Sequence, residues 1–141
     1  MKLDWRSIII SALGALVVGL VVFFALQPVF KIVAPGVMAE YGAAGIFRPW
    51  SDPWMSYVFV HPFFAGLFMA VVYNFVKDSI KADTLCKKGT HFGLLVFLLG
   101  IPGMLMSYST FLISGAMVVT WTVQAFLQTV LIGIVIAKVF K

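Results

Sequence analysis

The sequence predicts an all-α membrane protein with four transmembrane helices. Hydrophobic residues make up 62% of the 141 residues and charged residues only 11%, whereas soluble domains carry roughly 25% charged residues. The ten lysines and arginines lie almost entirely in short segments between long apolar runs. A soluble domain could not cover this much apolar surface, so the bilayer is expected to solvate most of the chain. One domain, 1–141, is expected at this length.

The first apolar run, 8–27, has the roughly 20 residues needed to cross a ~30 Å hydrocarbon core. It exceeds the ~7–15 apolar residues of a signal peptide and no A-x-A cleavage site follows it, so it is predicted to be a retained span. Ser11, Ala15 and Gly19 give it one face of small residues for close packing. Gln27-Pro28 is expected to end the helix, because proline disfavours helical geometry in the residue before it.

The connection 29–54 is the longest in the chain and interleaves aromatic residues with Pro and Gly turn signals. It is interpreted either as an interfacial loop with an aromatic belt or as a lid over a cavity between the helices. His61 is expected to be an interfacial side chain rather than a metal ligand. The candidates for an outer cap are Trp50, Trp54, Tyr57 and His61.

The second span is predicted at 55–76, with Gly66 and Ala70 as a packing notch. The loop that follows, 77–90, holds four lysines, and further basic residues flank both chain ends. Because basic residues concentrate on the cytoplasmic side, both termini are predicted to be cytoplasmic.

The third span is predicted at 92–113 and contains Gly100-Ile101-Pro102-Gly103 in its middle. Proline removes a helical hydrogen bond and would free a carbonyl near residue 98. Two interpretations stay open: a kink satisfied by a neighbouring helix or by Ser107, or a broken helix whose backbone lines a site. The ligand or pore candidates here are Gly100, Pro102, Gly103, Ser107 and Tyr108.

The fourth span is predicted at 116–139, after a turn near Ser114-Gly115. At 100° per residue, Trp121, Gln124 and Gln128 share one helix face, with the glutamines roughly 12 and 18 Å into the helix. An amide in hydrocarbon needs a partner, so this face is either glue between helices or subunits, or the wall of a wet pocket. Candidate site residues on this helix are Thr120, Trp121, Gln124 and Gln128, with Tyr73, Asn74 and Ser107 as possible amide partners.

Several chemistries find no support in the sequence. The spans carry no acidic or basic residue before the end of the last one, so a proton-coupled exporter is not expected. No metal-ligand spacing, phosphate loop or nucleophile motif occurs, so neither a metal, a cofactor nor a catalytic residue set is predicted. Cys86 is the only cysteine and is interpreted as an ordinary loop thiol.

Tyr108-Ser109-Thr110-Phe111 in the third span resembles the small dimeric fluoride channels, whose third helix breaks at a Phe-Ser/Thr-rich motif. The likeness covers four residues and implies a site at a helix break. That family also has an arginine in its first helix and an asparagine deep in its second helix. Here the first span has no arginine, and Asn74 lies at the cytoplasmic end of the second span. The whole chain resembles small four-helix prokaryotic membrane proteins of uncharacterised function. Membrane enzymes of eicosanoid and glutathione metabolism are similar in length, but their charged motif is missing here.

These observations favour a non-enzymatic interaction or assembly protein of the prokaryotic cytoplasmic membrane. It is expected to self-associate or to bind another membrane protein within the lipid bilayer, and not to bind nucleic acid. The alternatives are a passive channel or binder of a small ligand, using the third helix and the glutamine face, and a lipid-acting membrane enzyme.

Overall fold

The computed structural model describes residues 2–43 and 45–141. Its elements are α1 (Trp5–Val33), α2 (Pro35–Tyr41), the short 3-10 helix η1 (Pro53–Ser56), α3 (Tyr57–Val76), α4 (Leu85–Thr110) and α5 (Gly115–Val139). Helices α1, α4 and α5, and α3 together with η1, are each long and apolar enough to cross a membrane. The prediction of an all-α chain with four long apolar helices is therefore confirmed.

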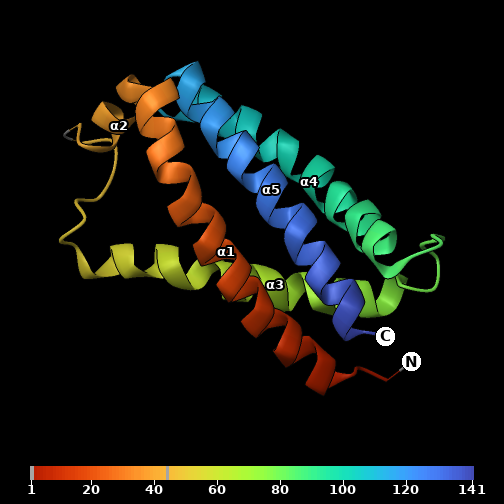
Figure 1. Cartoon of the computed structure of the whole chain (residues 1–141). Coiled ribbons are helices and arrows are strands. Elements are labelled where there is room, and N and C mark those ends of the chain that lie inside the picture. Colours follow the sequence, from red (N-terminus) through yellow and green to blue (C-terminus); the bar gives the residue numbers. More distant parts are fainter. Residues whose placement is uncertain (1, 44) are drawn as a thin grey trace.

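Helix α5 lies between α1 and α4, and the axes of these three helices have roughly the same inclination (Figure 1). Helix α3 crosses them at a large angle and packs mainly on α1, whereas α4 packs mainly on α5. Because α1 and α3 cross, the C-terminal end of α1 and the N-terminal end of α3 diverge (Figure 1). Helix α2 and the segment that follows it connect these two separated ends.

Small residues allow α1 and α3 to cross at close range. A Cβ added to Gly66 would lie 2.1 Å from Cβ of Ala15, and one added to Gly19 would lie 2.3 Å from Cβ of Pro62. Ser11 and Ala70 are fully buried beside them. The predicted small-residue face of the first helix and the notch of the second thus pack against each other, as small-residue interfaces in membranes do.

A second close contact joins α4 to α5, and the sequence interpretation missed it. A Cβ on Gly93 would lie 2.4 Å from the carbonyl oxygen of Thr129, and one on Gly89 would lie 2.4 Å from Cα of Ile134. Gly133 approaches the same segment, since its added Cβ would lie 2.4 Å from the Gly89 carbonyl oxygen. The spacing Gly89-x-x-x-Gly93 was the available signal, because it typically marks close helix packing.

The predicted end of the first helix is wrong. Helix α1 continues through Pro28 to Val33, where Ala34 caps it by donating its backbone N–H to the Phe30 carbonyl at 2.9 Å. Pro28 is exposed on the helix surface, and membrane helices tolerate proline better than soluble ones. The first residues of the predicted loop 29–54 are therefore helical.

The third helix also differs from its prediction. Helix α4 begins at Leu85, capped by the Thr84 side chain, which accepts from the Lys87 backbone N–H at 3.2 Å. It remains one continuous helix through Pro102, so the broken-helix interpretation is wrong. Ser107 donates to the Gly103 carbonyl at 2.9 Å instead of serving the carbonyl near residue 98.

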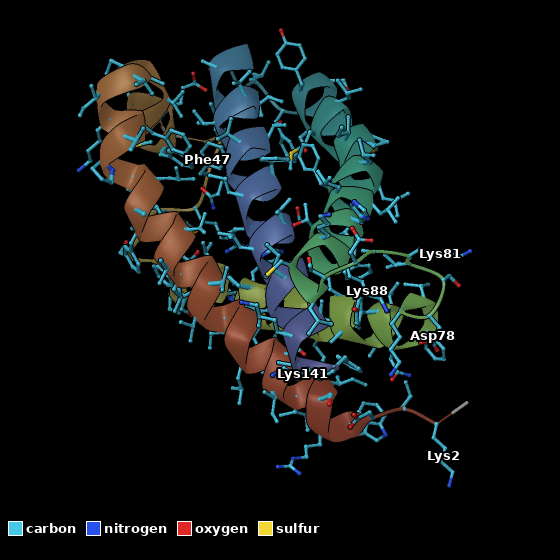
Figure 2. The ribbon with its side chains drawn as sticks, turned by 45° about the vertical axis from the view of Figure 1, so that its right-hand side comes forward. Lys2, Phe47, Asp78, Lys81, Lys88 and Lys141 are labelled. Atoms are coloured by element: carbon cyan, nitrogen blue, oxygen red, sulfur yellow. The ribbon has the colours of Figure 1, made fainter. Side chains whose placement is uncertain are left out.

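The two ends of the bundle differ in character. Lys2, Asp78, Lys81, Lys88 and Lys141 gather at one end, named the charged end, while Phe47 lies at the other (Figure 2). That second end, formed by α2, residues 42–43 and 45–56 and the α4–α5 turn, is named the loop end. At the charged end the core is aromatic: the Tyr73 ring centroid lies 5.0 Å from that of Phe92 and 5.6 Å from that of Phe140.

Candidate functional site

A cavity of about 460 Å³, named the deep chamber, lies between α1, α3 and α5, on the loop-end side of the α1–α3 crossing. Gln124 and Gln128 of α5 line it on one side, and Tyr57 and His61 of α3 line it on another. Its remaining walls are mainly apolar and come from Gly19, Leu20, Phe23, Val58, Phe59, Pro62, Met104, Trp121 and Ala125. Its volume falls in the ~300–1,000 Å³ range of small-molecule pockets.

A second cavity of about 690 Å³, named the loop chamber, adjoins the first at the loop end. Lys31 of α1 and Arg48 of the loop are its charged wall residues, and Trp50 is one of its aromatic ones. The other walls are Gln27, Met38, Tyr41, Phe47 and Met55. Both chambers share Phe23, Val58, Trp121 and Gln124 as wall residues, so they meet along this common boundary.

The two predicted glutamines have different roles. The Gln128 side-chain amide donates to the Gly19 carbonyl across the α1–α5 contact, at 3.2 Å. This hydrogen bond joins α5 to α1, which is the helix-to-helix contact expected of an amide in hydrocarbon. Its acceptor is a backbone carbonyl, and not one of the three side chains predicted as partners. Asn74 instead approaches the Lys2 carbonyl at the charged end, at 3.5 Å.

Gln124 lies one helical turn closer to the loop end and faces the boundary of both chambers. Its side chain is half-buried, and no hydrogen bond of its amide occurs within the described residues 2–43 and 45–141. A carboxamide offers both donors and an acceptor. Gln124 is therefore a polar group at the junction of two mainly apolar chambers and is available to a ligand or to water.

Three aromatic residues line the loop chamber and connect α2 to α5. The Trp121 indole N–H donates to the Tyr41 hydroxyl. The Phe47 ring centroid lies 5.3 Å from that of Tyr41 and 6.1 Å from that of Trp121, the latter edge-to-face. Burial raises the pKa of Tyr41, so its hydroxyl stays protonated at neutral pH. This arrangement favours the lid interpretation of the long connection over a plain interfacial belt.

A carboxylate provides a second contact between α2 and the start of α5. Glu40 accepts a hydrogen bond from the Ser114 backbone N–H at 3.0 Å, at the N-terminus of α5. Hydrogen bonding from Ser114 holds the pKa of Glu40 below its usual value of 4.5, and a negative charge at a helix N-terminus also interacts favourably with the helix dipole.

The Glu40 contact predicts a pH dependence. Because the folded-state pKa is lowered, the stabilisation is present above the unfolded pKa and is lost as the pH falls through the folded value. We expect the melting temperature of the native chain to decrease below about pH 4.5 more than that of Glu40→Gln. Melting curves of both proteins between pH 7 and pH 3 measure this difference, and parallel curves would show that the contact does not contribute.

Other predicted cap and helix residues lie around these chambers. Tyr57 and His61 line the deep chamber and Trp50 the loop chamber. Trp54 lines neither chamber and stacks on Tyr57 with ring centroids 5.3 Å apart. Thr120 is buried and donates to the Met117 carbonyl at 2.8 Å, away from both chambers.

The predicted candidates on α4 lie elsewhere. Gly100, Pro102, Gly103 and Tyr108 are exposed on the surface of the helix, and an added Cβ on either glycine would meet nothing within 4 Å. From this stretch of α4 only Met104 reaches the deep chamber. The structure thus brings the glutamine face together with three of the four cap candidates, Trp50, Tyr57 and His61, and leaves the Gly-Pro segment apart.

Sequence reasoning missed the basic residues of the loop chamber. Neither Lys31 nor Arg48 was among the predicted site residues. The missed signal was the spacing Phe23, Gln27, Lys31, which repeats every four residues and places all three on one face of a helix. That signal was hidden because the helix was expected to end at Pro28.

Within residues 2–43 and 45–141, no group of three or more His, Cys, Asp or Glu side chains could hold a metal ion. Comparison with known proteins finds no matching family model, and no curated protein or solved structure with significant similarity to this chain.

Proposed function

We propose that this chain is a multi-pass protein of the prokaryotic cytoplasmic membrane that binds a small ligand without chemical conversion. The observation that carries the proposal is Gln124, which lies at the boundary of two adjoining chambers that extend from the loop end into the helices. A polar group within apolar walls is the usual arrangement of a small-molecule site. The charged end would face the cytoplasm, because eight of the ten basic residues belong to segments at that end.

Thiol labelling tests this proposal. We expect Gln124→Cys, in a Cys86→Ser background, to react quickly with a water-soluble maleimide added at the loop-end side of oriented membranes. The matched control is Val123→Cys, because Val123 is 42% exposed on the surface of the same helix and lines neither chamber. In a bilayer this surface would face lipid, so the control should react slowly. Equal, slow labelling of the two folded variants would contradict an accessible site.

Assembly remains the second candidate function, favoured by the outer face of α4. Leu99 is 82% exposed and Met106 69% exposed, and α4 is the least buried of the long helices. This face would contact either lipid or a second copy of the chain. Oxidative crosslinking of Leu99→Cys in the Cys86→Ser background tests assembly: disulfide-linked dimers in membranes would support it, and their absence would favour a lipid-facing helix.

A further inference from the structure

The two chambers differ in the chemistry of their walls. The charged wall residues of the loop chamber are both basic, Lys31 and Arg48. Within the described part of the chain, the deep chamber has no Lys, Arg, Asp or Glu in its walls, and its most polar wall residues are Gln124, Gln128, Tyr57 and His61. No carboxylate lines either chamber among the residues that the structure describes. A ligand that fits both would be anionic at one end and apolar at the other.

We infer that the ligand is a single-chain anionic lipid, a fatty acid or its equivalent, drawn from the membrane leaflet at the loop end. Its head group lies at Lys31 and Arg48, and its hydrocarbon chain passes Trp121 into the deep chamber. This inference rests on the proposed function and adds the chemical class of the ligand.

Free hydrogen-bond donors on the two basic wall residues of the loop chamber support an anionic head group. Arg48 contacts Asp52 through one guanidinium nitrogen at 2.9 Å, and its side chain remains 63% exposed. A guanidinium carries five N–H donors, so one such contact leaves donors for a second anion. Lys31 is exposed and forms no ion pair with any described residue. The other nearby carboxylate, Glu40, is bonded to the Ser114 backbone.

The deep chamber supports a single apolar chain. Of its two amides, that of Gln128 is already bonded to the Gly19 carbonyl, and that of Gln124 lies at the boundary nearest the loop chamber. The other walls are mainly apolar, with Leu20, Phe59, Pro62, Met104 and Ala125 among them, and Tyr57 and His61 are the remaining polar side chains. At about 460 Å³ the chamber is near the lower part of the range for small-molecule pockets, which suits one chain better than two.

Tryptophan quenching tests the inference, because Trp121 is a wall residue of both chambers. The protein is placed in nanodiscs of neutral phosphatidylcholine, with Trp5, Trp50 and Trp54 replaced by Phe so that Trp121 alone reports. The probe is 11-bromoundecanoate. We expect saturable quenching that unbrominated dodecanoate reverses, that dodecanol reverses only at about tenfold higher concentration, and that acetate does not reverse.

Charge variants test the contribution of the anionic head group separately from that of the hydrocarbon chain. Lys31→Gln/Arg48→Gln should weaken dodecanoate binding by about tenfold or more and leave dodecanol binding unchanged. The matched control is Lys77→Gln/Lys81→Gln, which removes two positive charges at the other end and should change neither. Binding of radiolabelled dodecanoate to the chain with all its native tryptophans repeats the comparison if the single-tryptophan variant folds poorly.

The outcomes distinguish this inference from the proposed function. Equal competition by dodecanol and dodecanoate, with no effect of the charge variants, would contradict the inference that the head group of the ligand is anionic. Competition by acetate alone would contradict the inference that the ligand has a hydrocarbon chain and would indicate a small-anion site. Absence of saturable quenching, together with rapid labelling of Gln124→Cys, would overturn the lipid inference and leave an accessible site for another ligand. Absence of both would overturn the proposed function as well.

Discussion

Replacing Gly93 by alanine is expected to lower the free energy of unfolding by about 2–3 kcal/mol, as overpacking of a tight contact does. The new Cβ would lie 2.4 Å from the Thr129 carbonyl oxygen and 2.6 Å from Cα of Val130. Both are backbone atoms, so no side chain can rotate away and α4 must separate from α5. The melting temperature in detergent, measured by helical circular dichroism, reports the loss.

Gly100→Ala is the matched control on the same helix. An alanine Cβ there meets nothing within 4 Å, and alanine favours a helix over glycine by roughly 0.5–1 kcal/mol. The control should therefore be neutral or slightly more stable than the native chain. Similar destabilisation by both substitutions would show that α4 and α5 do not meet at Gly93.

Replacing Gly66 by alanine is expected to disrupt the crossing of α1 and α3 to a similar degree, by about 2–3 kcal/mol. Here the obstruction is a single methyl group, because the added Cβ would lie 2.1 Å from Cβ of Ala15 and 3.4 Å from the nearest backbone atom, Cα of Ala12. A second substitution, Ala15→Gly, removes that methyl group.

The double variant Gly66→Ala/Ala15→Gly should therefore recover most of the lost stability, since it moves one methyl group across the interface. Ala15→Gly alone should cost about 1 kcal/mol for a glycine within a helix, plus the loss of a buried methyl group. A double-mutant cycle of melting temperatures measures the coupling. Additive losses, with no recovery, would place Gly66 and Ala15 apart.

The sequence was sufficient for the helices and for much of the α1–α3 contact. Apolar runs of spanning length predict α1, α3, α4 and α5, and the four-residue spacing of Ala15 and Gly19 predicts a packing face. The glutamine face of α5 was also predicted from helical periodicity. Which glutamine is bonded could not be predicted, because it depends on the position of the Gly19 carbonyl relative to α5, which tertiary packing sets.

The rule that proline ends or breaks a helix misled the interpretation twice, because membrane helices tolerate proline better than soluble ones. Pro28 was expected to end a helix and Pro102 either to kink or to break one, yet both lie inside continuous helices. The first error separated Lys31 from the face of α1 that carries Phe23 and Gln27, and so hid the basic wall of the loop chamber. The second directed attention to Gly100 and Gly103, which are exposed.

A ligand that enters at the loop end and occupies the space beside Gln124 must shield residue 124 from water-soluble reagents. The labelling rate of Gln124→Cys, in the Cys86→Ser background, is therefore measured before and after saturation with dodecanoate. We expect rapid labelling of the empty protein and at least about tenfold slower labelling of the loaded protein, with Ser51→Cys in the exposed loop unchanged in both. A labelling rate at Gln124→Cys that dodecanoate does not change, or one that falls equally at Ser51→Cys, would contradict ligand binding beside Gln124.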